Sequence, residues 1–420
     1  MEREPIDGAS VPCPISSQFS RSCRLGRALS LAGAGFIGSL ALTSFGAAIV
    51  PATGAGASNP ASLNCGTLEI LGTDGNTYQF SEFTTGNATR GPNIDAGGAV
   101  AYGGNLAANN FTVAQNLSPL ATTSLTALVG GNESGQFNIQ KGSVVVAGTA
   151  SGPINLNGGT GTTKTVGGGA GTIPFSFSSI GTALAGCSNN YGPNGTTTLG
   201  TVTQLNPGFS TLGFYGTGQT NVFDLTTDQL AGVQKIDFSV PAHSTTLVEL
   251  TPSTDFSGSL NLAAISGNIY YGCPTTAPGA GNSLWNSGNC GSQPSANENT
   301  TTIDVERDNT VWNLPPNSFP ASDTLTVEGW QGTIVAPDQS VTLDSDGQFD
   351  GSIFAASISG GEQTNDDPFG GTMPTCYDPL PAALGEGLPI AMGGLALLAL
   401  AGVVLYRRRP SAVIDPSTGD

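Results

Sequence analysis

Short apolar runs separated by polar turns recur along most of this chain, and that pattern limits the folds open to it. Within residues 324–359 the sequence LTVEGWQGTIVAPDQSVTLDSDGQFDGSIFAASIS places a candidate strand about every 8 to 10 residues. Similar runs, GGAVAYGGNL and NNFTVAQNL, begin within residues 64–116. With 61 Gly and 27 Pro in 420 residues, the composition favours turns over helices. The sequence therefore predicts a mainly β protein.

Strands at this spacing can stack as successive turns of a β-solenoid, or β-helix, in which each turn buries its inward apolar side chains against the next. A β-sandwich gives a similar spacing, so that alternative stays open. The two segments of matching texture lie at opposite ends of the ectodomain. We expect a β-solenoid-like ectodomain in which these two segments lie side by side.

The middle of the chain has three other textures. Residues 198–269 predict an additional strand segment, with candidate strands VFDL, KIDFSV, TTLVEL and LNLAAI between Asp, Pro and Ser turns. The run FSFSSIGTALAGC, residues 175–187, predicts a helix. The run GGTGTTKTVGGGAGT, residues 158–172, has the low complexity of a linker.

Two hydrophobic segments bracket the chain. Three arginines, an uncharged run over residues 28–50 and small residues before Ser58 predict a signal peptide over residues 1–57, cleaved between Ala57 and Ser58. An uncleaved signal anchor is the alternative. Residues 388–406 carry no charge and would span roughly 28 Å as a helix, the thickness of a bilayer core. This predicts one C-terminal transmembrane helix.

These segments imply an order of domains. The ectodomain covers residues 58–373 and a short stalk covers residues 374–387. Arg407, Arg408 and Arg409 follow the span directly, which predicts a cytoplasmic tail over residues 407–420 and an extracellular ectodomain. The end of the chain also resembles a Gram-positive sorting signal, but residues 380–385 are LPAALG rather than LPxTG. Direct membrane anchoring is preferred, with cell-wall linkage as the alternative.

The ectodomain is strongly acidic. Between the hydrophobic ends lie 25 of the 30 Asp and Glu residues but only five cations, which are Arg90, Lys141, Lys164, Lys235 and Arg307. Such a surface repels phosphate backbones, because each phosphate contact needs a Lys or Arg. The sequence therefore predicts no nucleic-acid partner.

Five cysteines remain after the predicted cleavage site, and export favours disulfides. Cys273 and Cys290 bracket a loop rich in Gly, Pro and Asn, so we predict a disulfide between them, which would stabilise the fold by about 3 kcal/mol in the chain-entropy model. The pairing of the others, Cys65, Cys187 and Cys376, cannot be deduced from spacing. A zinc site is disfavoured, because there is no CxxC pair and only one histidine.

Two blocks resemble the choice-of-anchor A family of bacterial cell-surface proteins. The first is GGAVAYGGNL, residues 97–106. The second, residues 311–371, is similar to the family's succession of WNFP, GT(I/L)AP, G-x-(I/V)-x-A, G-E and P-F-x-G elements. One departure is that Gln363 and Thr364 follow Glu362, where relatives often have an aromatic residue and a histidine. The resemblance implies an anchored β-rich surface protein with an adhesive role, and it implies no established catalytic residues.

Acidic turns are the candidate metal ligands. Asp344, Asp346 and Asp350 in LDSDGQFDG surround a Gly turn with the oxygen donors that calcium prefers, although the closing Glu of an EF-hand is missing. A solvated turn between strands is the simpler interpretation, and calcium is the one cofactor that the sequence suggests. A second acidic loop follows the same reasoning, with Glu362, Asp366 and Asp367.

Other candidate site residues have a structural interpretation as well. His243 lacks a nucleophile motif nearby, so we expect an exposed turn residue rather than a catalytic base. Trp312 and Trp330 lie in the family-like block, where core packing is expected. Trp285, in the predicted disulfide loop, is the better candidate for an exposed contact.

The sequence thus predicts a non-enzymatic, membrane-anchored cell-surface protein that is adhesive or structural in the envelope. Possible partners are an extracellular matrix protein, a wall polymer or a glycan. The first alternative is a surface polysaccharide-active enzyme on a β-helix scaffold, which would need a groove with converging carboxylates. The second is binding of ice or another crystal surface by a flat face, which would need aligned Thr rows.

Overall fold

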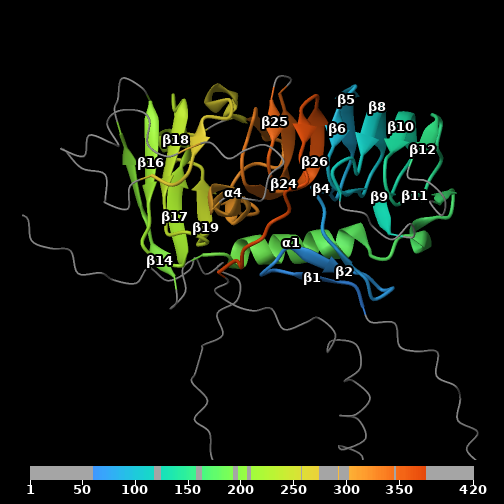
Figure 1. The fold of residues 1–420 in the computed structure, drawn as a ribbon, viewed down its shortest axis with the longest axis horizontal. Helices are drawn as coiled ribbons and strands as arrows, with labels where there is room; N and C mark the ends of the chain where they lie inside the picture. Colours follow the sequence, from blue (N-terminus) through green and yellow to red (C-terminus); the bar gives the residue numbers. More distant parts are fainter. Residues whose placement is uncertain are drawn as a thin grey trace, which may run out of the picture. The chain divides into compact units, whose positions relative to one another are not determined.

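The computed structural model describes residues 60–117, 124–157, 163–192, 197–205, 210–256, 258–273, 292, 302–344 and 347–374. All of them belong to the first of two compact units, Met1–Tyr377. The described residues are mainly β (Figure 1), which confirms the predicted class. None of their helices has the length and apolar character needed to cross a bilayer. The predicted signal peptide and the predicted span, residues 388–406, lie outside the described residues.

In the first half of the unit, the described residues form thirteen strands. An antiparallel sheet of three short strands comes first, with β1 Ser62–Asn64, β2 Glu69–Leu71 and β3 Thr77–Tyr78. Ten strands follow: β4 Glu82–Thr84, β5 Ala88–Pro92, β6 Asp95–Ala96, β7 Val100–Tyr102, β8 Leu106–Val113, β9 Leu125–Val129, β10 Glu133–Ile139, β11 Ser143–Val146, β12 Ile154–Leu156 and β13 Lys164–Val166.

The second half begins after a 3₁₀ turn, η1 Ala170–Thr172, and helix α1, Phe177–Asn190. Its elements are β14 Thr198–Leu199, β15 Thr201–Gln204, β16 Thr211–Tyr215, β17 Thr220–Thr226, α2 Thr227–Leu230, β18 Lys235–Ser239, β19 Thr245–Thr251, β20 Leu260–Asn261, η2 Ala263–Ile265 and β21 Ile269–Tyr270. Helix α4 Thr302–Asp308 and six strands complete it: β22 Thr310–Asn313, β23 Thr324–Val327, β24 Thr333–Leu343, β25 Gln348–Phe349, β26 Ile353–Gly360 and β27 Gln363–Thr364.

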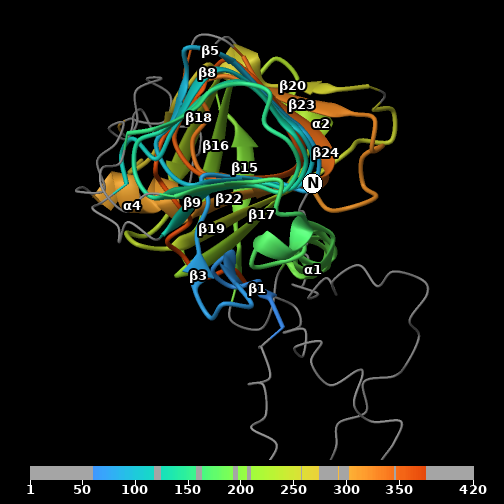
Figure 2. The ribbon, with the colours of Figure 1, turned by 90° about the vertical axis from the view of Figure 1, so that its right-hand side faces the viewer.

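Most strands pair in parallel, and those of the largest sheet form three ladders. A separate four-stranded sheet has the order β15, β16, β18, β21, with β15 antiparallel to β16 and the other pairs parallel. The first ladder runs β14, β17, β19, β22, β24, β26, β4, β7, β9, β11, β13. The second runs β20, β23, β24, β26, β5, β8, β10, using the later residues of β24 and β26. The third runs β25, β27, β6, β8, β10, β12. Consecutive strands such as β4, β5 and β6 belong to different ladders, so the chain passes from one ladder to the next (Figure 2).

The strands of the three ladders lie one beside the next in a single stack. The two halves of the chain meet in the middle of this stack. Strand β26 pairs with β4 and β5, so that Ile353 lies opposite Glu82 and Ile358 lies opposite Ala88. Strand β27 pairs with β6 in the same way. The prediction that two distant segments lie side by side is confirmed. We call this junction the seam.

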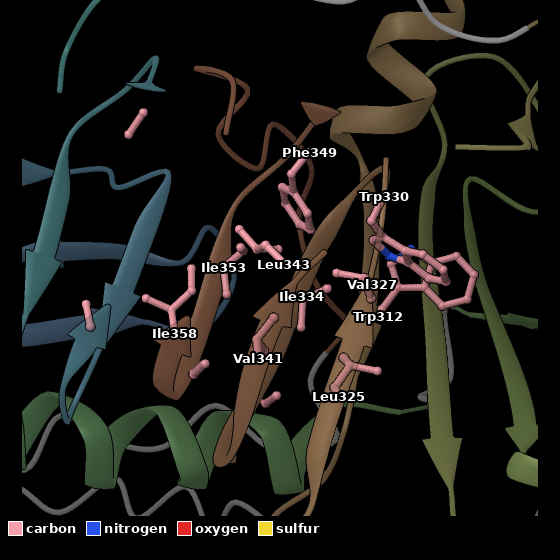
Figure 3. Packing of buried hydrophobic residues seen from close by; sticks show 14 of the residues in the cluster. Trp312, Leu325, Val327, Trp330, Ile334, Val341, Leu343, Phe349, Ile353 and Ile358 are labelled. Carbon is pink, nitrogen blue, oxygen red and sulfur yellow. The ribbon is translucent and has the colours of Figure 1, made fainter. Parts of the chain in front are cut away.

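The interior is filled by apolar side chains that alternate along each strand. Residues of successive strands line up across the ladders, as Ile334 and Ile353 do (Figure 3). Trp312 and Trp330 pack edge to face, with ring centroids 4.9 Å apart, and are 2% and 1% exposed. The prediction that both tryptophans belong to the core is confirmed.

Helix α1 covers the outward side of the first ladder and runs along the stack (Figure 1). The prediction of a helix here is confirmed. Ser176 caps its N-terminus by accepting a hydrogen bond from the Ser179 amide at 3.3 Å. Ile180 and Leu184 are buried against Phe354 and other residues of the ladder. The first ladder is therefore apolar on both faces, as is usual for covered parallel sheets.

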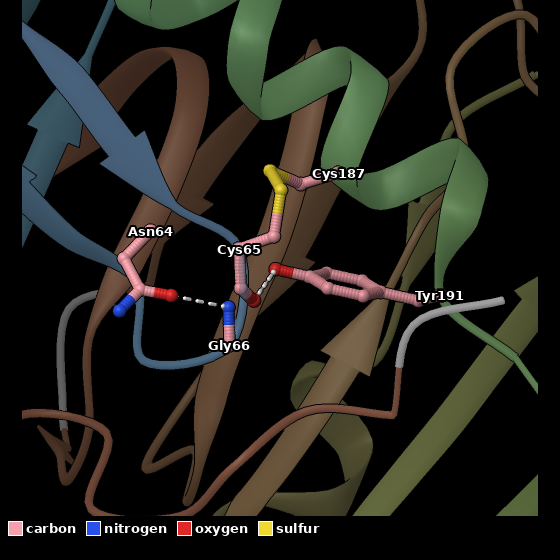
Figure 4. The surroundings of a disulfide bond; sticks show 5 residues. All are labelled: Asn64, Cys65, Gly66, Cys187 and Tyr191. Atoms are coloured by element: carbon pink, nitrogen blue, oxygen red, sulfur yellow. Dashed lines mark hydrogen bonds between the residues drawn. A yellow bond between two sulfur atoms is a disulfide. The ribbon is translucent and has the colours of Figure 1, made fainter. Parts of the chain in front are cut away.

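A disulfide joins Cys65, beside β1, to Cys187 in α1 (Figure 4). Both cysteines are buried, and Tyr191 donates a hydrogen bond to the Cys65 carbonyl at 2.9 Å. The bond spans 122 residues of sequence, a pairing that spacing alone could not give. Cys273 is also disulfide-bonded. Because Cys290 lies outside the described residues, the predicted bridge between these two stays a prediction.

Two local predictions need correction. Part of the predicted linker is ordered structure, because Lys164–Val166 forms β13 and pairs in parallel with β11. The residues of this segment have only a weak propensity for β structure, and hydrogen bonds to the adjacent strand stabilise it. The predicted strand LNLAAI is a strand only over Leu260–Asn261, and Ala263–Ile265 forms a 3₁₀ turn instead.

Hydrogen bonds between asparagines hold together the turns that connect the first ladder to the second. The Asn105 amide donates to the Asn87 side-chain oxygen at 2.8 Å, and the Asn132 amide donates to the Asn105 side-chain oxygen at 2.8 Å. A Cβ atom on Gly104 or Gly131 would collide with these side-chain oxygens. The Gly-Asn pairs of the sequence are therefore required by the contact between neighbouring turns.

We expect Asn105→Ala to lower the free energy of unfolding by about 1–2 kcal/mol, because the Asn132 amide loses its acceptor. Urea denaturation would measure this. Asn109→Ala is the control, because Asn109 is an exposed asparagine of β8 that is not one of these hydrogen-bonded turn residues. Equal losses for the two variants would mean that the hydrogen bonds between the turn asparagines contribute nothing to stability.

Candidate functional site

The outward side of the second ladder carries a row of small, mostly polar side chains. Strand pairing aligns one residue from each of seven strands, and all seven are half-buried or exposed. In spatial order they are Asn261, Thr326, Thr342, Ser359, Thr89, Ala107 and Ser134. A second, shorter row lies beside it, with Thr324, Ser340 and Ser357 in register. We call these ten residues the hydroxyl face.

The alternation of the strands explains why these residues face outward. Between them lie Leu325, Val341, Ile358 and Leu106, which are buried in the core at 0–3% exposure. In a strand, successive side chains point to opposite sides. One set of residues therefore fills the interior while the next set forms the surface.

Hydrogen bonds between strands hold several hydroxyl groups in place. The Thr342 and Ser359 hydroxyl oxygens lie 3.0 Å apart, and the Ser357 hydroxyl donates to the Ser340 hydroxyl oxygen at 2.7 Å. Adjacent strands in a sheet are about 4.8 Å apart, so four hydroxyl groups in succession repeat at that interval, those of Thr326, Thr342, Ser359 and Thr89. Ala107 interrupts the row before Ser134. The result is a regular array of short, fixed polar groups.

The hydroxyl face contains no charged residue, although the chain has a formal net charge of -18. Exposed carboxylates include Asp224, Asp228 and Asp344, of which Asp344 directly follows β24. The two arginines among the described residues, Arg90 and Arg307, are fully buried and do not contribute to the surface. An uncharged array on an anionic molecule suits a ligand that offers hydrogen bonds without charge.

A family model described as "Putative Ice-binding-like adhesive domain" matches residues 73–366. The chain belongs to this ice-binding-like adhesive domain family. The matched range includes all ten residues of the hydroxyl face. No curated protein and no solved structure matches the chain.

Within this adhesive domain, the acidic turns that sequence suggested for calcium are divided between two environments. Asp344 is exposed, whereas Asp350 is 5% exposed and accepts a hydrogen bond from the Asn365 side-chain amide. Asp346 lies outside the described residues. In the described part of the chain, no group of three or more His, Cys, Asp or Glu residues is placed to hold a metal ion. Calcium binding by the three aspartates stays a prediction.

The second acidic loop of the domain is used internally. Glu362 is fully buried and accepts a hydrogen bond from the Gly329 amide at 2.5 Å. Asp367 pairs with Arg307 at 3.0 Å. Asp366 is half-buried, and burial raises the pKa of its carboxyl to about 6. These side chains stabilise the fold rather than present ligands to solvent.

Arg307 in α4 is surrounded by carboxylates. It pairs with Asp308 at 2.9 Å and Asp367 at 3.0 Å, and Asp350 lies 3.9 Å away. Burial raises the pKa of Asp308 to about 7 and of Asp350 to about 6, although the guanidinium opposes both shifts. The guanidinium therefore occupies the position that a cation would otherwise take among these side chains.

The remaining predicted site residues of the adhesive domain are not part of the hydroxyl face. His243 is exposed in a turn with φ 59°, which confirms the predicted turn position. Trp285 lies outside the described residues, so its predicted surface contact is untested. The hydroxyl face itself was missed at the level of individual residues, although T-L-T-V, S-V-T-L and S-I-S carry its alternating signal.

Proposed function

We propose that this chain is a cell-surface adhesin whose hydroxyl face binds ice, or another ordered and uncharged surface that presents water or hydroxyl groups in a repeating array. The aligned rows carry the proposal, because a regular array of fixed hydroxyl groups matches a regular lattice better than a flexible or charged ligand. The family description supports both the adhesive role and the kind of ligand. Aligned Thr and Ser residues are what the flat-face hypothesis required.

The three parallel ladders support the interpretation of the domain as a β-solenoid. A solenoid keeps successive turns in register and so extends one surface row over many strands. Figure 2 shows the strands of successive turns overlaid when the stack is viewed near its axis. This architecture suits the presentation of a flat face.

The chain's anchoring is part of the same proposal. The resemblance to choice-of-anchor A proteins and the apolar residues 388–406 support a single C-terminal membrane span. An adhesin needs such an attachment, because a contact made by the ectodomain holds the cell only if the chain is held by the cell. A non-enzymatic role follows from the same reasoning, since the flat face offers contact rather than a reaction site.

The hydroxyl face can be tested by adding bulk at its centre. We expect Thr342→Tyr to weaken adsorption to ice at least tenfold, because the ring would stand above the row and separate it from a flat surface. The matched control is Thr112→Tyr, which makes the same change on an outward position of the third ladder. Partition of the protein between ice and liquid measures adsorption, and thermal unfolding verifies that both variants fold.

A second arm of this experiment replaces ice with insoluble crystalline cellulose. Loss of binding to either solid in Thr342→Tyr, with binding kept in Thr112→Tyr, would support the assignment of the face. If the two variants bound both solids as well as the unmodified protein does, the hydroxyl face would not be the adhesive surface.

A further inference from the structure

The last described residues, 367–374, form the exit of the chain from this unit. Two segments that are distant in sequence form hydrogen bonds with the end of this exit. The Met373 amide donates to the Gly66 carbonyl at 2.9 Å. The Gly192 amide donates to the Pro374 carbonyl at 3.3 Å. Gly66 lies in the turn between β1 and β2, and Gly192 follows α1. The exit is therefore fixed to both.

The same two segments are joined covalently. Cys65 immediately precedes Gly66, and Cys187 lies five residues before Gly192, and these cysteines form the disulfide (Figure 4). The disulfide thus connects the two backbones that hold the exit. We call this arrangement, the disulfide with Gly66 and Gly192, the exit socket.

Buried apolar side chains also hold the exit in place. Phe369 and Met373 are each 4% exposed and belong to the same apolar cluster as Cys65 and Cys187. Between them, the Thr372 amide donates to the Thr245 hydroxyl oxygen at 3.2 Å. Burying these two large apolar side chains stabilises the position of the exit. The exit is therefore packed into the socket as well as hydrogen-bonded to it.

The strands just before the exit are poorly suited to resist a pull. β27 has only two residues, and it follows β26, which lies at the seam between β24 and β4. A force on the tail without the socket would act on β27 first and then on β26. Hydrogen bonds that are peeled in sequence break one at a time, and the seam would open from the C-terminal side.

We propose that the exit socket carries tension from the C-terminal tail into α1 and the first sheet, so that pulling on the tail does not peel β27 and β26 from the stack. This rests on the proposed function, because a tethered adhesin is the protein that experiences tension at this end. The disulfide then slows unfolding when force is applied to the C-terminal tail, but not when force is applied between two positions on the hydroxyl face.

The test compares two pulling directions in the full chain. In the first, handles are attached at Asp420 and at an azide-bearing residue in place of Ser134. In the second, they are attached at positions 134 and 261, both on the hydroxyl face, so that the pull bypasses the socket. Unfolding rates at constant force are measured for the unmodified protein, for Met373→Ala, and for the double variant Cys65→Ala/Cys187→Ala.

In the tail direction, we expect both variants to unfold at least tenfold faster, equivalent to about 1.4 kcal/mol of barrier. In the face direction, their rates should match that of the unmodified protein. Reductant should accelerate the unmodified protein in the tail direction but not the double variant, which separates this bond from the disulfide at Cys273. Met373→Ala keeps the disulfide, so it tests the socket if the double variant does not fold.

Equal acceleration in both directions would overturn the proposal, because it would show a general loss of stability. Unchanged rates in the tail direction would overturn it as well. The proposed adhesive function fails separately, through unaltered ice adsorption by Thr342→Tyr, which does not involve the socket.

Discussion

Replacing Arg90 with methionine is expected to lower the free energy of unfolding by about 3–5 kcal/mol, because the change leaves a buried carboxylate without its partner. Arg90 and Glu82 are both fully buried and lie 3.1 Å apart. The guanidinium also donates to the Glu362 carbonyl at 2.7 Å and the Gly360 carbonyl at 3.3 Å. Arg90 thus connects the first strands of the domain to its last ones across the seam.

The carboxylate that Arg90 neutralises is also held from both halves of the chain. Glu82 accepts a hydrogen bond from the Tyr102 hydroxyl at 2.5 Å and from the Thr364 hydroxyl at 2.6 Å. Methionine fills a similar volume to arginine but supplies no charge and no donors. The loss therefore comes from the unpaired Glu82 and from two backbone carbonyls.

Urea unfolding measures this effect, with Lys164→Met as the matched control. Lys164 is an exposed cation on β13, so its replacement changes the net charge equally and should cost less than about 0.5 kcal/mol. Hydrogen exchange should show faster opening of β26, β4 and β5 in Arg90→Met. If the two variants were equally stable, Arg90 would not hold the seam. A double variant, Arg90→Met with Glu82→Gln, should recover part of the loss.

The sequence predicted the class of fold and the side-by-side position of its two end segments. Both predictions depend on local sequence patterns that the folded structure keeps. Gly-Asn turns and alternating apolar runs mark the strands, and matching texture in residues 64–116 and 324–359 indicated that both segments build the same kind of structure. Helix α1 was predictable because its residues leave the alternating pattern. Trp312 and Trp330 were predictable as core residues from their size.

The hydroxyl face was not predictable because it depends on register between strands that are far apart in sequence. Ser359 and Thr89 are adjacent on the face but 270 residues apart in the chain. The turns between strands also vary in length, so no fixed repeat aligns Thr326 with Thr342 in sequence. A shift of one residue would send either side chain into the core.

The buried ions were missed for a related reason. Charged residues are seldom fully buried unless they are paired, so Arg90 and Arg307 were counted as part of the ectodomain's surface charge. Their partners come from distant segments, as Asp367 does for Arg307. Sequence shows the scarcity of cations, but it does not show which carboxylates they neutralise.

The domain is expected to be more stable near pH 5 than near pH 8.5, because many of its carboxyl groups are buried. Burial raises the pKa of several groups above the ordinary values of 3.8 for Asp and 4.5 for Glu. They are Glu249 and Glu362, at about 8, Glu306 and Asp308, at about 7, and Asp237, Asp350 and Asp366, at about 6.

The sign follows from where protons are bound. Between about pH 4.5 and pH 8 the native protein keeps protons that the unfolded chain has released, so raising the pH favours unfolding. Each such group contributes up to about 1.4 kcal/mol for each pH unit between its unfolded and folded pKa values. The stabilisation is complete below the unfolded pKa values and is lost as pH rises through the folded ones. Thermal unfolding between pH 4.5 and pH 9 measures the trend.

Glu362→Gln isolates one group in this series. Glu362 is fully buried, and its carboxyl has a pKa of about 8 because burial disfavours the charged form. Glutamine keeps an oxygen that can accept from the Gly329 amide but cannot ionise, so the variant should lose less stability than the unmodified protein between pH 6 and pH 9. Asp255→Asn is the matched control, because it removes an exposed carboxylate that does not contribute to the raised pKa of Glu362, and it should change the slope less than Glu362→Gln does. Parallel pH profiles for all three proteins would show that Glu362 does not hold a proton in the folded state.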